Sequence, residues 1–265
     1  MEVLVTNDDG HDSPGLHALV DSLDEIGDVS VLAPAEDHSG VGRLRSDSVS
    51  VREAPTGRVV TGTPADCVIV GLEGLDLDPD LVVAGCNVGA NVGAYTLGRS
   101  GTVSAAIEGA FRGVPAIALS LYVPEDRWPL RPTRKHFTEA VHVGRYLATE
   151  LAQEQVLPDD GLLNVNVPLG APDPLRLRVT TPSPHHPLTV EENGDELQIR
   201  DGTWDLMASG EWEEESETDR GAILDGAVSV TPLTAHHERL ELPSIESLLG
   251  AYHHASRDVD GTENA

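Results

Sequence analysis

The sequence predicts an α/β fold, with a Rossmann-like, doubly wound and mostly parallel sheet followed by a C-terminal, hairpin-rich extension. Strand-like and helix-like segments alternate from the start of the chain to about residue 167. The strand-like segments are apolar on both faces, as in Val3-Leu4-Val5, which is typical of parallel strands that helices cover on two sides. A chain of 265 residues is also long enough to bury a large core.

The first half of the chain alternates between extended and helical patterns. Apolar runs that end at turn residues predict strands, and apolar positions with helical spacing predict helices. Pro64 suits the first turn of a helix because proline lacks an N–H group. In chain order, we predict a strand over residues 2–6, a helix over 15–26, a strand over 29–33, short extended segments over 48–52 and 58–61, a helix over 64–72, a strand over 81–85, a helix over 102–111 and a strand over 116–121.

The second half begins with a long helix and continues in shorter pieces. The run of like charges over 211–217 predicts a solvated loop. The other predicted elements are a helix over 136–155, a strand over 162–167, extended pieces over 175–180 and 197–200, a strand over 226–233, a last helix over 245–252 and a frayed tail from 256. We therefore expect a Rossmann-like core over 1–170, an extension over 171–255 and a flexible tail over 256–265.

The charge balance indicates adaptation to a high-salt cytoplasm. The chain has 45 acidic and 17 basic residues, a formal net charge of −28, and Lys135 as its single lysine. At molar salt the Debye length is about 3 Å, so the repulsion within such a surface is largely screened. An acidic protein of ordinary cytoplasm is the alternative, but the shortage of lysine beside abundant arginine argues against it. We expect the fold and activity to fade at low salt.

Composition also restricts the partners. No stripe of Lys and Arg is present to bind a nucleic acid polymer. No run of 18 apolar residues could cross a membrane, and the N-terminus enters a predicted strand directly, so we expect a cytoplasmic protein with no membrane partner. Cys67 and Cys86 are too few for a disulfide scaffold and suit packing positions. A small anionic substrate remains possible if a cation and helix N-termini supply positive potential.

Two adjacent carboxylates, Asp8 and Asp9, follow the first predicted strand. Their Cα atoms are about 3.8 Å apart, so the ionised side chains repel unless something positive lies between them. Asn, Asp and Gly also form turns, and an ordinary turn is the alternative on these residues alone. In open parallel sheets, however, ligands bind beyond the carboxyl ends of the strands, which is where this loop lies.

Two further loops leave the predicted carboxyl edge with unusual polar content. The loop after the second strand places Ser39 beside Gly40, although Glu36 and Asp37 suit an ordinary polar loop. The loop after residue 85 alternates glycines with Asn87 and Asn91, and an Asn carbonyl is a neutral oxygen ligand. The next helix opens at Ser100, Gly101 and Thr102, which form either a phosphate site or an ordinary helix cap.

The loops together offer two carboxylates, one hydroxyl and one amide oxygen, from Asp8, Asp9, Ser39 and Asn87. Such a set suits Mg²⁺ or Mn²⁺, which also share substrate phosphate oxygens, and a cation would relieve the repulsion between Asp8 and Asp9. The histidine pairs at 185–186, 236–237 and 253–254 lie outside this set, and we expect them on the surface. No G-x-S-x-G, Walker or G-x-G-x-x-G motif is present, which argues against a serine hydrolase, a P-loop enzyme and a dinucleotide binder.

Seven ordered segments extend from the first strand to about Leu233: VLVTNDDGHDSPGLHAL, VLAPAEDHSG, GTPADCV, PDLVVAGCNVGANVG, SGTVSAAIEG, LNVNVP and GAVSVTPL. Together these segments resemble the SurE family, the stationary-phase survival family of metal-dependent nucleotidases. The resemblance implies a Rossmann-like catalytic core with a protruding C-terminal part used to form a homodimer or homotetramer. It also implies hydrolysis of nucleoside 5′- and 3′-monophosphates and, in some members, of short polyphosphate.

The resemblance assigns roles residue by residue. It implies one divalent metal ion per subunit, Mg²⁺ or Mn²⁺, with Asp8, Asp9, Ser39 and Asn87 as ligands and the two aspartates as the catalytic pair. It implies that Asn91 and the turn of Ser100, Gly101 and Thr102 line the phosphate. The segments 84–87 and 94–96 depart from the common family pattern, which bears on pocket shape and substrate preference. A non-catalytic nucleotide-binding regulator and a phosphatase for another small phosphoester are the alternatives.

Overall fold

The structure is a computed structural model and describes residues 1–128, 130–154, 156–209, 212–237 and 245. The chain divides into two units, Met1–Ala235 and His236–Ala265. Apart from residue 245, the predicted last helix over 245–252 and the predicted tail over 256–265 lie outside the described residues. The predicted boundary at residue 170 stays a prediction.

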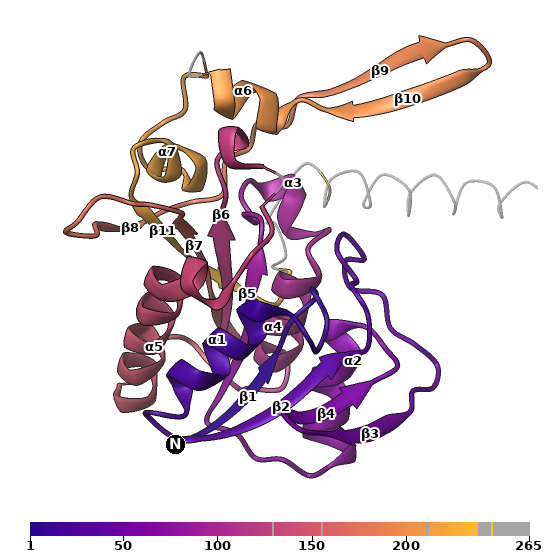
Figure 1. Cartoon of the computed structure of the whole chain (residues 1–265), viewed down its shortest axis with the longest axis vertical. Coiled ribbons are helices and arrows are strands. Elements are labelled where there is room, and N and C mark those ends of the chain that lie inside the picture. Colours follow the sequence, from indigo (N-terminus) through magenta and orange to yellow (C-terminus); the bar gives the residue numbers. More distant parts are fainter. Residues whose placement is uncertain (129, 155, 210–211, 238–244, 246–265) are drawn as a thin grey trace, which may run out of the picture. The chain divides into compact units, whose positions relative to one another are not determined.

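In the described part of Met1–Ala235, nine strands form a mostly parallel sheet (Figure 1). Their order is β3-β4-β2-β1-β5-β6-β7-β11-β8. Neighbours from β4 to β7 are parallel, whereas β3 is antiparallel to β4 and β11 is antiparallel to β7. This arrangement confirms the predicted α/β fold. The strands are β1 (Glu2–Thr6), β2 (Asp28–Pro34), β3 (Val51–Ala54), β4 (Gly57–Val60), β5 (Leu81–Val88), β6 (Ala116–Tyr122), β7 (Gly161–Pro168), β8 (Leu177–Val179) and β11 (Val228–Thr234).

Helices cover both faces of the sheet. Because successive side chains of a strand point to opposite faces, a central strand such as β1 contributes to two separate hydrophobic clusters. Val3 of β1 belongs to the core cluster that contains Leu19 of α1 and Val143 of α5. Leu4, the next residue, belongs to the other cluster, with Val103 of α4. The two clusters confirm strands that are buried on both faces. The helices flanking the sheet are α1 (Pro14–Leu23), α2 (Pro64–Ile69), α4 (Gly101–Ala110) and α5 (Thr138–Gln153).

Helix starts follow capping residues, and several short elements were not predicted. Ser13 and Ser100 cap α1 and α4 by accepting hydrogen bonds from backbone N–H groups of the first turn. The predicted helix over 136–155 begins instead as the 3-10 turn Arg134–Phe137 before α5. The predicted helix over 64–72 corresponds to α2 and the start of η1 (Val70–Gly74). The elements absent from our prediction are α3 (Ala94–Leu97), η2 (Glu125–Arg127), α6 (Thr203–Ser209), α7 (Asp219–Leu224) and β9 (Leu188–Asn193). Among the described residues, no helix is both long enough and apolar enough to span a membrane.

Strand β5 extends beyond the predicted end at residue 85 and includes Asn87. Its pairing with β6 shifts register between Ala84 and Asn87, which marks an irregularity in the strand. Gly85 lies within this irregularity with φ +146°, and a β-carbon there would overlap the carbonyl oxygen of Leu119. Asn87 is therefore held on a strand end rather than in a flexible loop.

Strands β9 (Leu188–Asn193) and β10 (Glu196–Asp201) form a separate antiparallel hairpin that projects as an arm in Figure 1. Every residue of both strands is exposed. Val190 pairs with Ile199, so these two side chains share one face, and Leu188 and Leu197 lie on the same face by the alternation of the strands. The arm thus presents an apolar face to its surroundings.

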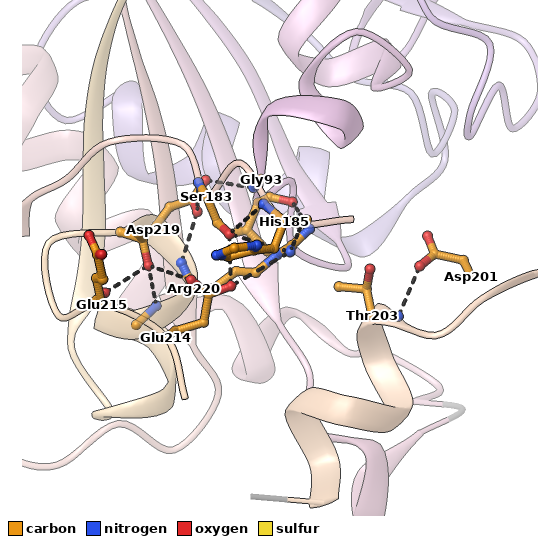
Figure 2. A network of polar contacts seen from close by, with 12 residues as sticks. Gly93, Ser183, His185, Asp201, Thr203, Glu214, Glu215, Asp219 and Arg220 are labelled. Atoms are coloured by element: carbon orange, nitrogen blue, oxygen red, sulfur yellow. Dashed lines mark hydrogen bonds and ion pairs between the residues drawn. The ribbon is translucent and has the colours of Figure 1, made fainter. Parts of the chain in front are cut away.

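A buried carboxylate, Asp219, connects the C-terminal part of the sheet to the glycine-rich loop after β5 (Figure 2). Its Oδ2 accepts a hydrogen bond from the backbone N of Gly93 (2.7 Å), and its Oδ1 accepts from the N of Ser183 (2.9 Å). Thr218, the preceding residue, caps α7. Segments distant in sequence are therefore joined through one side chain.

The adjacent Arg220 is also fully buried. Its guanidinium donates hydrogen bonds to the carbonyl oxygens of His185 and Val92, lies 3.8 Å from the Glu214 carboxylate and stacks over Trp212 with 5.0 Å to the ring centroid. Burial lowers the pKa of Arg220, and the neighbouring carboxylates oppose that effect. Removing one member of such a buried network leaves another buried charge without a partner, which is costly.

We expect Gly93→Ala to destabilise the fold. Gly93 has φ +84°, and a β-carbon there would lie 2.7 Å from Cζ of Arg220. The free energy of unfolding should fall by about 2 kcal/mol or more. Urea denaturation in molar KCl measures the change. Gly98→Ala is the matched control, because no atom lies within 4 Å of the added carbon. Equal midpoints for the two variants would show that Arg220 does not need the space at Gly93.

Candidate active site

The loops after β1, β2 and β5 meet at one end of the sheet. These strands are parallel neighbours, so their carboxyl ends lie at the same edge. The backbone N of His38 donates a hydrogen bond to the carbonyl oxygen of Asp8 (2.8 Å), and the N of Val88 donates to Oδ2 of Asp9 (3.2 Å). All three loops therefore contribute to one site.

Asp8 lies against the N-terminus of α4. Its Oδ1 accepts a hydrogen bond from the hydroxyl of Thr102 (2.6 Å), and its Oδ2 accepts one from the backbone N of the same residue (3.2 Å). A β-carbon at Gly101 would lie 2.9 Å from Cβ of Asp8, so the helix approaches the carboxyl group directly. The free N–H groups and the dipole of the first helical turn favour negative charge at this point.

Asp9 lines a cleft of about 560 Å³ together with Asp37 and Ser39. Ser39 is exposed, and both its backbone N (2.8 Å) and its hydroxyl (2.6 Å) donate to Oδ1 of Asp37. Asn87 is buried close to Val88, which also lines the cleft. The side-chain nitrogen of Asn87 donates to the carbonyl oxygen of Gly89 (2.6 Å), so its Oδ1 is the atom suited to bind a cation.

Hydrogen bonds between neighbouring residues hold the turn that carries the two aspartates. The side-chain nitrogen of Asn7 donates to the carbonyl oxygen of Gly10 (3.0 Å) and to the hydroxyl of Ser13 (2.7 Å). Ser13 is at the same time the cap of α1. The turn chemistry that we considered as an alternative is therefore present, and it positions the two carboxylates.

Burial and neighbouring negative charge raise the pKa values of both aspartates. Burial is the main cause for Asp8, against the hydrogen bonds from Thr102. Burial, and then the charge of Asp8, raise the pKa of Asp9 from 3.8 to about 7. That difference corresponds to about 4 kcal/mol against the ionised form. Asp37 adds further negative charge next to both groups.

The donor set fits a hard divalent cation. The buried Asp8 and the partly buried Asp9 lie near a third carboxylate, Asp37, and the charges that act on them are all negative. A cation would therefore remove an electrostatic cost that the described residues leave in place. Hydroxyl and amide oxygens from Ser39 and Asn87 complete an oxygen-only set of the kind that Mg²⁺ and Mn²⁺ prefer. Within the described residues, no group of three or more His, Cys, Asp or Glu side chains forms a metal cluster by itself.

The residues predicted to bind phosphate lie in two different environments. The Ser100 hydroxyl accepts from the backbone N of Val103 (3.1 Å) as the cap of α4, next to Asp8 and its Thr102 partner. Asn91 is buried, and its side-chain nitrogen donates to the hydroxyl of Ser120 (2.9 Å) on β6. Its backbone N donates to Oδ1 of Asn166 (2.7 Å) on β7. The phosphate roles of these residues stay predictions.

Sequence reasoning missed two features near the site. Asp37 was assigned to an ordinary polar loop, although it holds Ser39 and shares its cleft with Asp9. Its position two residues before Ser39 was the available signal, because Asp side chains often bond to backbone N–H groups two residues on. Our expectation of surface histidines was wrong for His186, whose ring stacks on Tyr95 with centroids 3.6 Å apart, whereas His236 and His237 are exposed.

The chain has a Rossmann-like α/β fold, with an oxygen-rich, acidic site at the carboxyl ends of its central strands. The family model described as "Survival protein SurE" matches residues 3–187. The chain belongs to the SurE family, which confirms the resemblance seen in the sequence.

Individual relatives extend the match to nearly the whole chain. Proteins named 5′-nucleotidase SurE from Natronomonas pharaonis and Halobacterium salinarum are 48% and 46% identical, over 89% and 91% of this chain and 94% and 95% of their own. Both come from halophilic archaea, in agreement with the composition. The crystal structure of the SurE protein from Aquifex aeolicus superposes with a TM-score of 0.79 at 31% identity, and covers 94% of this chain and 99% of that one.

We expect Thr102→Val to destabilise the protein. Valine has a similar shape but cannot donate to Oδ1 of Asp8, and a hydrogen bond to a charged group contributes about 1.5–3 kcal/mol. Thermal and urea unfolding in molar KCl and EDTA measure the loss. Thr102→Ser keeps the hydroxyl and is the control, and it should remain close to the wild type. Equal stability of the Val and Ser variants would contradict the anchoring of Asp8 by this hydroxyl.

Proposed function

We propose that this chain is a divalent-metal-dependent phosphatase that hydrolyses nucleoside 5′-monophosphates, and also 3′-monophosphates, to nucleoside and phosphate. Membership of the SurE family and relatives named 5′-nucleotidase support this activity. The observation that carries the metal dependence is the pair of the buried Asp8 and the partly buried Asp9, which lies at the carboxyl edge with negative neighbours and raised pKa values.

Asp8, Asp9, Ser39 and Asn87 would hold one Mg²⁺ or Mn²⁺ ion per subunit. When bound, such an ion supplies positive charge that polarises a phosphoryl oxygen and offsets the charge of the transition state. Thr102 fixes the orientation of Asp8 through two hydrogen bonds, and the N–H of Val88 fixes that of Asp9. This anchoring keeps the carboxylates in place without a substrate.

The remaining proposed roles concern the phosphate and the attacking water. Asp9 lines the open cleft, whereas Asp8 is held against α4, so we assign to Asp9 the acceptance of the proton from water. Ser100, Gly101 and Thr102 lie at the start of α4, where backbone N–H groups favour phosphate oxygens, and Asn91 would complete the phosphate environment. Substrate thus enters through the cleft that contains Asp9.

Oligomer formation is a further part of the proposal. The hairpin of β9 and β10 presents Leu188, Val190, Leu197 and Ile199 as an exposed apolar face. A two-stranded hairpin alone is marginally stable in water, so a second copy of the chain would both cover this face and support the arm. We propose a homodimer or homotetramer in the cytoplasm.

The activity is tested by phosphate release from AMP and GMP in molar KCl. We expect release with Mn²⁺ or Mg²⁺, no release with EDTA, and loss of at least about 100-fold in kcat for Asp8→Asn because the cation loses a charged ligand. Circular dichroism should show an intact fold. Asp24→Asn, a change at an exposed carboxylate after α1, is the control.

Four outcomes would contradict the proposed function. Release at wild-type rates by Asp8→Asn, or in EDTA, would remove the catalytic role of the aspartate pair and its metal. Nucleotide binding without any release would indicate the non-catalytic regulator instead. Release from short polyphosphate or sugar phosphates but not from nucleotides would indicate a phosphatase for another substrate.

The arm is tested by the oligomeric state in molar KCl. Ile199→Glu places a charge on the apolar face and should shift the mass measured by light scattering toward the monomer. Gln198→Glu adds the same charge on the opposite face, where the Gln198 side chain meets Arg200, and should leave the mass unchanged. An assembled Ile199→Glu variant, or a monomeric wild type, would contradict this role of the hairpin.

A further inference from the structure

An aromatic hollow lies directly beside the acidic cleft. It has a volume of about 370 Å³ and is lined by the aromatic residues Tyr122, Trp128 and Trp204 together with Gly89, Ala90, Val123 and Asp205. Tyr122 ends β6, and Trp204 lies in the first turn of α6, the helix near the top of Figure 1. Elements far apart in the sequence therefore build its walls.

The geometry of the two main rings suits a flat ligand. The centroids of Tyr122 and Trp204 are 6.5 Å apart, and their planes differ by 22° from parallel. This separation is at the upper end of the about 4.5–7 Å found for aromatic pairs, so the faces are not pressed together. Trp204 and Trp128 are 38% and 55% exposed, which leaves ring surface available to a ligand.

The gathering of three aromatic residues around one hollow is unusual for a chain with so few of them. Only 3% of the residues are aromatic, and the whole sequence has three tryptophans. Two of those three, with one tyrosine, surround one hollow. The third, Trp212, is used to cover the guanidinium of Arg220 in the core. Exposed apolar rings gathered at one point generally mark a binding site.

The hollow and the acidic cleft are joined at two points. Trp128 lines both of them. Val88 lines the acidic cleft while Gly89, the next residue, lines the hollow. The carbonyl oxygen of Gly89 also accepts the hydrogen bond from the side chain of Asn87, one of the proposed metal ligands. A ligand with its phosphate in the cleft can therefore place an attached ring system in the hollow.

We propose that the hollow is the nucleobase subsite of this phosphatase, in which Tyr122 and Trp204 stack on a purine and Trp128 covers the passage to the phosphate. The inference rests on the proposed function, since it assigns the base of the same substrate. Asp205 lies at the hollow and, as a carboxylate, accepts hydrogen bonds, which favours bases that carry an amino group. Stacking tolerates different bases because every base has a π face, so the subsite selects nucleotides over other phosphoesters.

The test compares Trp204→Ala with Trp204→Phe on two substrates, AMP and ribose 5-phosphate, in molar KCl with Mn²⁺. Loss of one stacking ring should lower kcat/KM for AMP roughly 5- to 100-fold in the Ala variant, and only slightly in the Phe variant. The value for ribose 5-phosphate, which has no base, should stay within about twofold of the wild type. Tyr146→Ala removes an exposed ring on α5, far along the sequence from the hollow, and should change neither value.

A binding measurement separates this inference from the proposed function. Adenosine, titrated calorimetrically in EDTA, requires neither metal nor turnover, and it should bind to the wild type and to Tyr146→Ala but not to Trp204→Ala. If no phosphoester is hydrolysed while adenosine binds in this pattern, the proposed function fails and the base subsite stands. The subsite is overturned if adenosine binds Trp204→Ala as it binds the wild type, or if that variant loses activity equally on AMP and ribose 5-phosphate.

Discussion

The site depends on holding two neighbouring carboxylates, the buried Asp8 and the partly buried Asp9, at the end of β1. Asp8 is held by the hydroxyl and the N–H of Thr102 at the start of α4, and Asp9 by the N–H of Val88 at the end of β5. These hydrogen bonds stabilise the charged forms only in part, because burial and the negative charge of neighbouring carboxylates still raise both pKa values. The remaining electrostatic cost is the reason for proposing that the pair binds a divalent cation, which would offset it.

A second constraint holds the surroundings of that pair in place. Asp219 and Arg220 connect α7 to the segment around Gly93, beyond the strand end that carries Asn87. Gly93 must lack a side chain because the guanidinium occupies the adjacent space. The C-terminal part of the chain thereby supports loops that it does not itself form, and α6 from the same part supplies a wall of the aromatic hollow.

The sequence predicted the sheet and the acidic edge, because both follow from local signals. Apolar runs defined β1, β5 and β6, and the order of strands and helices required their carboxyl ends to meet. The bond between Asp8 and Thr102 joins residues 94 positions apart, and no local pattern indicates it. The same holds for the buried Arg220 and for the pairing of Tyr122 with Trp204, since each becomes meaningful only when distant segments pack together. We did not predict the short helices α6 and α7, because they too depend on packing between distant segments.

The central claim is that oxygen atoms from three loops bind one divalent cation through Asp8 and Asp9. Titration of the metal-free protein with Mn²⁺ in molar KCl, followed by electron paramagnetic resonance, measures this without any turnover. The account predicts saturation at one Mn²⁺ per chain, which Asp8→Asn abolishes or weakens by at least about tenfold. Absence of Mn²⁺ uptake by the wild type, or unchanged uptake by Asp8→Asn, would contradict it.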